Sequence, residues 1–182
     1  ENLVITNRGN ITANNIVVAT HYPIMNAPGY YFMKMHQERS YVLALENTSE
    51  IDGMYIDINK EGYSFRTYNN LLLLGGISHR TGENEEGGSY DKLRKVAKEL
   101  YTKAKEKYYW SAQDCMTIDG IPYIGRYSSE TPNIYVATGF NKWGMTSSMV
   151  SAMIISDMIL EKENDFSEIF SPRRFDLSLS IN

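Results

Sequence analysis

The most informative stretch of this sequence reads Val136-Ala137-Thr138-Gly139-Phe140-Asn141-Lys142-Trp143-Gly144-Met145-Thr146. The apolar run before Gly139 predicts a buried strand over residues 133–139, and a helix is predicted from about Gly144 to Glu161. A strand that ends in glycine and leads into a helix presents unpaired backbone N–H groups and the positive end of the helix dipole, which favours an anionic or electron-accepting ligand. The alternative is an ordinary strand–helix joint, because glycines are common at such joints.

The stretches before this joint predict strands that belong to two lobes. Leu3–Thr6 and Ile11–Thr20 flank the turn residues 7–10 and predict a hairpin. Its second strand ends in the apolar run Ile16–Ala19, which suits a strand buried on both faces. Strand character resumes at Arg39–Leu45 after polar and turn-forming residues, which indicates a crossing into a second lobe.

The middle of the chain predicts an antiparallel meander from three short extended runs, Met54–Ile58, Tyr63–Tyr68 and Leu71–Leu74. The Gly- and Glu-rich stretch 75–88 predicts a loop. Ser89 can cap a helix that covers one side of the meander. The apolar face of this helix carries Leu93, Val96, Ala97, Leu100, Tyr101 and Ala104. These elements predict a mixed α+β fold, with an antiparallel sheet covered by a helix.

The composition argues against several classes of function. A formal net charge of −4 with dispersed basic residues gives no patch for a nucleic acid or an anionic membrane. A single cysteine, Cys115, cannot make a disulfide within the chain and indicates a reducing cytoplasm. His36 and His79 have no partners at metal-ligand spacing, so we expect no metal site. The apolar stretch Met145–Leu160 is too short and too polar to span a membrane, and residues 1–15 lack the features of a secretion signal.

Further stretches carry a resemblance to a known family. Ala19-Thr20 ends one apolar strand, Asp119-Gly120-Ile121-Pro122-Tyr123-Ile124-Gly125 is rich in turn residues, and Ala137-Thr138-Gly139 ends another strand. In this order the chain resembles flavin oxidoreductases of the D-amino-acid oxidase and glycine oxidase superfamily. It is most similar to the branch that is fused to a C-terminal Rieske iron–sulfur domain. The segments that carry this closer similarity are Trp110-Ser111-Ala112-Gln113-Asp114-Cys115-Met116, Gly139-Phe140-Asn141-Lys142-Trp143-Gly144-Met145 and Phe170-Ser171-Pro172-Arg173-Arg174-Phe175.

The resemblance implies a division of the chain. Residues 1–30 and 117–165 would be pieces of a Rossmann-like FAD-binding lobe, residues 31–116 a substrate-binding lobe, and residues 166–182 a tail towards a downstream domain. The flavin ring would lie over the joint, where backbone N–H groups stabilise the negative charge that develops on the ring during reduction. The implied cofactor-binding residues are Thr138, Gly139, Phe140, Asn141, Lys142, Trp143, Gly144, Met145 and Thr146.

Two departures from the family pattern concern the cofactors. The glycine fingerprint G-x-G-x-x-G, which holds the FAD pyrophosphate, is absent from the sequence. We therefore expect an internal or C-terminal fragment that binds FAD weakly or not at all by itself. The sequence also lacks the two Cys and two His ligands of a Rieske [2Fe-2S] cluster, which would belong to a downstream domain. The expected partners are the N-terminal FAD segment and the C-terminal Rieske domain of the same parent.

A third departure concerns the substrate. Glycine-oxidase-like relatives carry an arginine that anchors the substrate carboxylate, and Asp114 stands at that position here. If Asp114 faces the pocket, a cationic amine is favoured over a free amino acid, because two carboxylates repel each other; the alternative is a solvated or turn residue. Arg39, Tyr41 and Arg66 are the other candidates for substrate contact, with surface or cross-strand pairing as their alternative.

No residue is assigned as an acid or base, because this superfamily oxidises the amine without an obligatory protein base. The candidates for a catalytic role are Lys142, Asp114 and Gln113, and Lys142 either stabilises reduced flavin or points to solvent. The sequence thus predicts a fragment of a flavin-dependent oxidoreductase that oxidises a C–N bond of a small amine or amino acid by hydride transfer to FAD. Electrons would leave through a Rieske cluster or to oxygen. The alternative is a non-catalytic α+β ligand-binding or interaction module, and flavin absorbance of the parent distinguishes the two.

Overall fold

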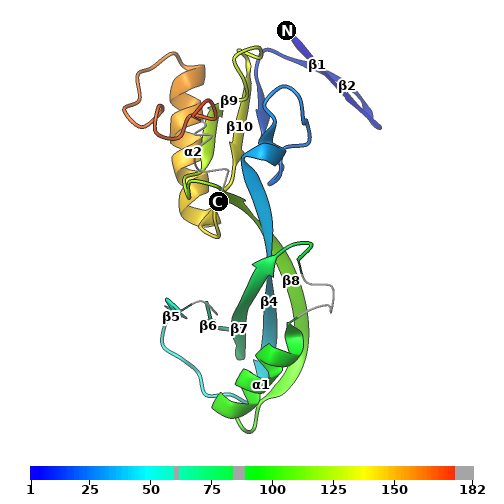
Figure 1. Ribbon diagram of the computed structural model, residues 1–182, viewed down its shortest axis with the longest axis vertical. Helices are drawn as coiled ribbons and strands as arrows, with labels where there is room; N and C mark the ends of the chain where they lie inside the picture. Colours follow the sequence, from blue (N-terminus) through cyan, green and yellow to red (C-terminus); the bar gives the residue numbers. More distant parts are fainter. Residues whose placement is uncertain (60–61, 84–88, 175–182) are drawn as a thin grey trace. The chain divides into compact units, whose positions relative to one another are not determined.

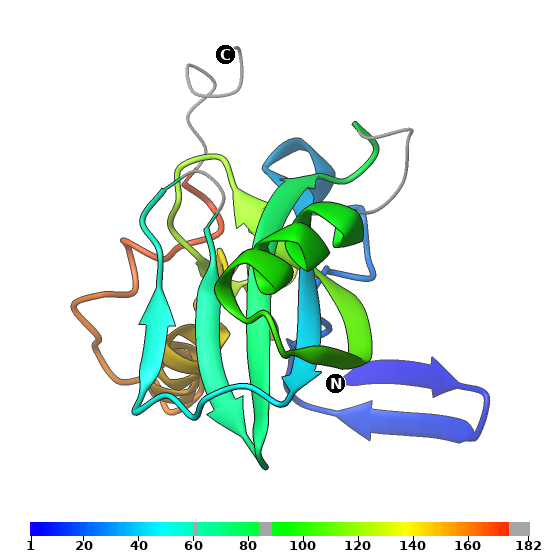
Figure 2. The same cartoon turned by 90° about the horizontal axis from the view of Figure 1, so that it is seen from below.

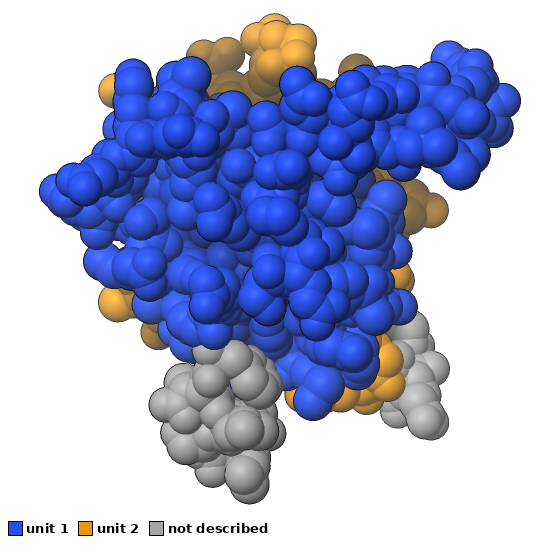
Figure 3. Space-filling view, turned by 90° about the horizontal axis from the view of Figure 1, so that it is seen from above, with its two compact units in different colours: residues 1–36, 115–182 blue, residues 37–114 orange. Residues whose placement is uncertain are grey.

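The computed structural model describes residues 1–59, 62–83 and 89–174, which form two compact units (Figure 1 and Figure 3). Unit 1 comprises residues 1–36 and 115–182, and unit 2 comprises residues 37–114. Parts of two predicted segments, 84–88 of the loop and 175–182 of the tail, lie outside the described residues. The assignment of the units to an FAD-binding and a substrate-binding lobe stays a prediction.

Unit 1 begins with a hairpin. Its strands, β1 (Asn2–Thr6) and β2 (Gly9–Ala13), pair antiparallel. The prediction of one strand over Ile11–Thr20 is wrong, because the chain bends at Asn14 and the apolar run that follows, β3 (Ile16–Val18), joins a different sheet. Burial of this run on both faces is also wrong. The Val17 side chain is 45% exposed, because its face of β3 borders an open groove beside α2.

The main sheet of unit 1 has β10 (Ile134–Thr138) at its centre, between β3 and β9 (Tyr123–Arg126). β10 runs parallel to β3 and antiparallel to β9. One face of the sheet packs against α2 (Gly144–Ile159), which lies beside β9 and β10 in Figure 1. Both faces of β10 are buried, as the sequence predicts. The residues that surround it are Ile124, Ile154 and Ile155 on the α2 side, and Val18, Tyr31, Cys115, Tyr123 and Tyr127 on the other.

The other face of β10 is covered by a loop that contains a short 3-10 helix, η1 (Tyr31–Met33). The Tyr31 ring meets the rings of Tyr123 and Tyr127 edge to face, with centroids 6.1 and 5.0 Å apart. The Tyr31 hydroxyl donates to the carbonyl of Tyr127 at 2.9 Å. Because the buried hydroxyl has an acceptor, this aromatic cluster can form a core without an unpaired polar group.

Unit 2 is a five-stranded sheet with one helix. In sheet order the strands are β5 (Met54–Ile56), β6 (Ser64–Tyr68), β7 (Leu71–Arg80), β4 (Met35–Glu46) and β8 (Lys105–Thr117). β5, β6, β7 and β4 pair antiparallel along this order, which confirms the predicted meander. The helix α1 (Tyr90–Leu100) packs across β7 (Figure 2). The core between helix and sheet consists of Tyr41, Leu43, Leu45, Leu72, Leu74, Leu93 and Ala97.

Two predictions for this region need correction. The predicted loop from residue 75 is wrong as far as Arg80, because β7 continues through Gly75 and Gly76. A side chain at Gly75 would come within 2.6 Å of the Ser64 hydroxyl, so glycine there maintains strand pairing rather than breaking the strand. Leu100, predicted on the buried helix face, is exposed because α1 ends at that residue. Among the described residues, no helix has the length and apolar character needed to span a membrane.

Candidate functional site

The connection from β10 to α2 begins at a tightly packed glycine. Gly139 has a φ of +71°, in the left-handed region that favours glycine. A Cβ atom at this position would lie 2.3 Å from the Thr117 Cγ2 atom and 3.1 Å from the Met35 sulfur. The packing around the end of β10 therefore requires glycine at residue 139.

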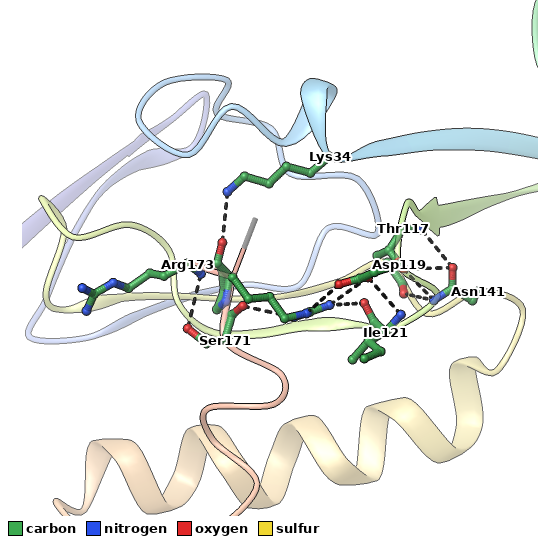
Figure 4. A network of polar contacts seen from close by, with 10 residues as sticks. Lys34, Thr117, Asp119, Ile121, Asn141, Ser171 and Arg173 are labelled. Carbon is green, nitrogen blue, oxygen red and sulfur yellow. Dashed lines mark hydrogen bonds and ion pairs between the residues drawn. The ribbon is translucent and has the colours of Figure 1, made fainter. Parts of the chain in front are cut away.

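The connection continues with two residues in the left-handed region, Asn141 (φ 47°) and Lys142 (φ 71°). Asn141 is fixed by its own bonds to the end of β8. Its backbone N–H donates to the Cys115 carbonyl at 3.2 Å, and its Oδ1 accepts the Thr117 backbone N–H at 2.8 Å. Its Nδ2 donates to the Thr117 hydroxyl at 3.1 Å and to the Gly139 carbonyl at 2.9 Å. Figure 4 shows Asn141 directed at Thr117. Asn141 thus joins the loop to the end of β8 through its backbone and its side chain.

The start of α2 is open. The first helical bond of α2 runs from the Ser147 N–H to the Trp143 carbonyl at 2.9 Å, and no side chain caps the helix. The amides of Gly144, Met145 and Thr146 therefore have no partner within the helix. A Cβ at Gly144 would meet nothing within 4 Å, and Met145 is 86% exposed. Three N–H groups and the positive end of the helix dipole consequently face open space beside a glycine.

Of the nine residues predicted to bind the cofactor, Gly139 and Asn141 shape the turn, and the other seven divide into two groups. Thr138 is buried and donates its hydroxyl to the His21 carbonyl, and Phe140 packs partly against the α2 core, so both support the loop from inside. Residues 142–146 are exposed and together form the open surface of the loop and the helix start. Trp143 is 62% exposed, so its ring does not fill the core of unit 1.

An apolar groove of about 670 Å³ runs along one face of α2 in unit 1. It is lined by residues of β3, β10 and the small-residue face of the helix, including Val17, Ala137, Ser148, Ala152 and Ile155. Serine and alanine side chains are small, so a neighbouring element can approach this face of the helix closely. Ser147 and Ser151 are buried, whereas Ser148 and Ala152 border the groove.

Sequence reasoning missed an ion pair near the loop. Arg174 donates from Nε to Asp119 Oδ2 at 2.8 Å and from Nη2 to Asp119 Oδ1 at 3.2 Å. Burial alone would raise the pKa of the Asp119 carboxyl, but hydrogen bonds from Arg174, the Ile121 N–H and Thr117 outweigh it and hold that pKa below its ordinary value. Asp119 and Arg174 are 55 residues apart, so no local pattern could pair them.

The candidates in unit 2 lie in different environments. The Tyr41 ring is buried under α1 and its hydroxyl lies 2.8 Å from His79 Nε2, so the structure gives Tyr41 a packing role. Arg39 has a buried Nε atom without a hydrogen-bond partner among the described residues, and Arg66 is exposed on β6.

The remaining two candidates, Gln113 and Asp114, are neighbours on β8. Because successive side chains of a strand point to opposite faces, these two cannot line the same face of β8. Gln113 donates to the Thr81 hydroxyl at 3.3 Å. The structure therefore does not gather Gln113 and Asp114 into one catalytic group.

The chain belongs to the family of FAD dependent oxidoreductases, whose model matches residues 2–158. It is 40% identical over 182 residues to YhfW of Bacillus subtilis (strain 168), whose name describes a Rieske 2Fe-2S iron–sulfur protein. That match covers 97% of this chain and 36% of YhfW, so the chain spans about a third of this relative.

Solved structures show the same fold at low identity. Glycine oxidase from Geobacillus kaustophilus has a TM-score of 0.76 at 21% identity, over 96% of this chain and 49% of that one. L-proline dehydrogenase from P. horikoshii has a TM-score of 0.72 at 21% identity, over 95% of this chain and 50% of that one. The α+β fold expected from the sequence is thereby confirmed, and the resemblance to glycine oxidases holds at the level of the fold.

Proposed function

We propose that the parent protein oxidises a C–N bond of a small amine or amino acid, and that the loop 139–146 lies against the flavin ring. The observation that carries this proposal is the open start of α2, where the amides of Gly144, Met145 and Thr146 have no partner in the helix. Such amides stabilise negative charge without any reorganisation at the moment it develops. When bound, FAD would supply the hydride acceptor for the C–N bond.

The residues of this chain fit such a group on structural grounds. Gly144 leaves space for a planar ring to approach the backbone, and Gly139 and Asn141 hold the preceding turn in a fixed geometry. The cation of Lys142 is exposed in the same turn, where it would strengthen the positive potential at the ring. Preorganised donors of this kind are worth more than flexible ones, because the cost of orienting them falls on folding.

The remainder of the FAD-binding lobe is proposed to cover the groove along α2. β3 has β10 as its single neighbour in the described sheet, and Val17 and Ala152 border the apolar groove beside it. The segment carrying the glycine fingerprint, upstream in the parent, would complete the sheet there and hold the pyrophosphate. We expect Ala152→Arg in the parent to weaken flavin retention, because it places a charge in this groove.

The proposed substrate is a cationic amine. Asp114 is half-buried on β8, and its side chain makes no hydrogen bond or ion pair with a described residue. A carboxylate in that position attracts an ammonium group and repels a second carboxylate. Electrons are proposed to continue to a Rieske cluster elsewhere in the parent, supported by the name of YhfW. A reducing cytoplasm is proposed as its location, since Cys115 is single and buried.

The test is flavin reduction in the purified parent without oxygen. Bleaching of the flavin absorbance by amines or amino acids, but not by alcohols of the same size, is the expected result. Asp114→Arg should raise kcat/KM for carboxylate-bearing amines relative to simple amines, and Asp114→Asn should give an intermediate ratio. A parent that never takes up flavin would instead support the non-catalytic module.

A further inference from the structure

Besides the groove along α2, unit 1 contains a second pocket, of about 500 Å³. Three segments form its walls: residues 28–34, which include η1, the turn that follows β9, and residues 172–173 beyond α2. None of its described lining residues belongs to the loop 139–146. The volume lies within the range of pockets that hold small molecules.

The three walls of this pocket are joined by hydrogen bonds. The Tyr31 hydroxyl donates to the Tyr127 carbonyl at 2.9 Å, which joins η1 to the turn after β9. Lys34 Nζ donates to the Pro172 carbonyl at 3.0 Å, which joins the end of η1 to the C-terminal segment (Figure 4). Gly29 has a φ of +120°, and a Cβ atom there would lie 2.7 Å from the Tyr31 ring. The pocket is therefore shaped by the fold itself, which lowers the cost of binding a ligand.

The charged side chains on the described wall are Lys34, Arg173 and Glu130, so cations outnumber carboxylates. Lys34 is half-buried, and its Nζ lies 5.1 Å from the centre of the Tyr31 ring. Burial, together with the nearby Arg174, lowers the pKa of Lys34 from its ordinary value. Both effects disfavour the charged form of Lys34, and an anion beside it would offset them. Glu130 is exposed, so solvent screens its opposing charge.

Much of the remaining wall is apolar and open to solvent. Tyr30 is 54% exposed, Met33 is 51% exposed, and both line the pocket together with Pro28. The Ser128 hydroxyl borders the same space. Apolar surface with a few polar groups that fix the orientation of a ligand is the usual composition of a small-molecule site.

We propose that this pocket binds a small organic anion, with a carboxylate or phosphate group next to Lys34 and Arg173. The apolar part of the ligand lies against Tyr30 and Met33. This site is separate from the proposed flavin contact, so it stands or falls independently of the function proposed above.

The test is calorimetric titration of the parent protein with three probes: phenylacetate, phenyl phosphate and 2-phenylethanol. Both anions should bind, and 2-phenylethanol should bind at least tenfold more weakly than phenylacetate, because it has the same carbon skeleton without the charge. The tighter of the two anions shows whether a carboxylate or a phosphate is the preferred group.

Three variants locate the binding site. Lys34→Met keeps most of the apolar stem but removes the charge, and should weaken anion binding about tenfold. Arg173→Gln should weaken it about threefold, since this side chain is exposed, and Glu130→Gln should strengthen it about twofold by removing a like charge. Arg8→Gln is the matched control. Arg8 is exposed in the turn between β1 and β2 and does not line the pocket, so this variant should bind the anions normally.

The exposed variants keep the test decisive even if Lys34→Met does not fold. The proposal is overturned if neither anion binds, or if 2-phenylethanol binds as tightly as phenylacetate. It is also overturned if Arg173→Gln and Glu130→Gln both bind the anions with the same affinity as Arg8→Gln.

Discussion

The two ends of the β10–α2 connection differ in packing and hydrogen bonding. At the first end, Gly139 is packed against Thr117 and Met35, and Asn141 uses its backbone N–H and both polar atoms of its side chain in bonds. At the second end, Gly144 faces open space and no side chain caps the helix. Packing and hydrogen bonds are therefore used to fix the geometry of the loop, whereas the amides at the helix start remain available to a ligand.

This difference separates two roles that glycine plays in one short segment. Gly139 is required by the folded chain itself, because of its φ and its neighbours. Gly144 has no such requirement, since it opens α2 and a Cβ there would meet nothing within 4 Å. Gly144 is therefore the position at which the proposed flavin contact can be tested separately from the stability of the fold.

The largest effect on stability is expected from Gly139→Ala. The left-handed backbone costs alanine about 1 kcal/mol, and the overlap with Thr117 adds about 1–3 kcal/mol. Urea denaturation of the chain should show this loss. If Gly139→Ala leaves the free energy of unfolding unchanged, Gly139 is not tightly packed, and the contrast with Gly144 does not hold.

Asn141→Ala should have the next largest effect, about 2 kcal/mol, because it removes the side-chain bonds and leaves the buried Thr117 N–H unpaired. Asn141→Asp keeps the oxygen acceptor and tolerates the left-handed region, so it should destabilise less. Equal losses for the two variants in thermal denaturation would show that the Oδ1 atom has no special part in closing the loop.

A smaller, pH-dependent effect is expected from the Asp119–Arg174 ion pair. The pKa of Asp119 is lower in the folded chain than its ordinary value, so its stabilisation is present above that value and is lost as pH falls through the folded pKa. Among the described residues, Lys34 also lies close to Arg174, and burial together with this arginine lowers the Lys34 pKa from its ordinary value. The free energy of unfolding should fall below about pH 4, and Asp119→Asn should flatten this decline. If the free energy of unfolding of Asp119→Asn falls with pH as steeply as that of the unchanged chain, the decline does not come from Asp119.

The elements around this connection differ in how far the sequence could predict them. β10 and α2 follow from local pattern, since an apolar run, glycines and a helical stretch lie within about 25 consecutive residues. The sequence predicts β7 too short, because Gly75 and Gly76 resemble a turn until the pairing with β6 and β4 is known. The bond of Arg174 to Asp119 joins residues 55 positions apart and has no local signal. The loop-closing role of Asn141 could have been predicted from the sequence, because asparagine is among the non-glycine residues that most readily adopt the left-handed region.

The smallest effect on stability, and the most direct test of the account, is expected from Gly144→Ala in the parent. Alanine should leave the free energy of unfolding unchanged or raise it by up to about 1 kcal/mol, because it favours the helix. Flavin affinity, measured by fluorescence titration, should nevertheless fall at least tenfold, because a methyl group would occupy the space where the ring approaches the amides. Lys162→Ala, beyond the other end of α2, should bind flavin normally. Unaltered flavin affinity in Gly144→Ala would contradict the claim that the helix start faces the flavin.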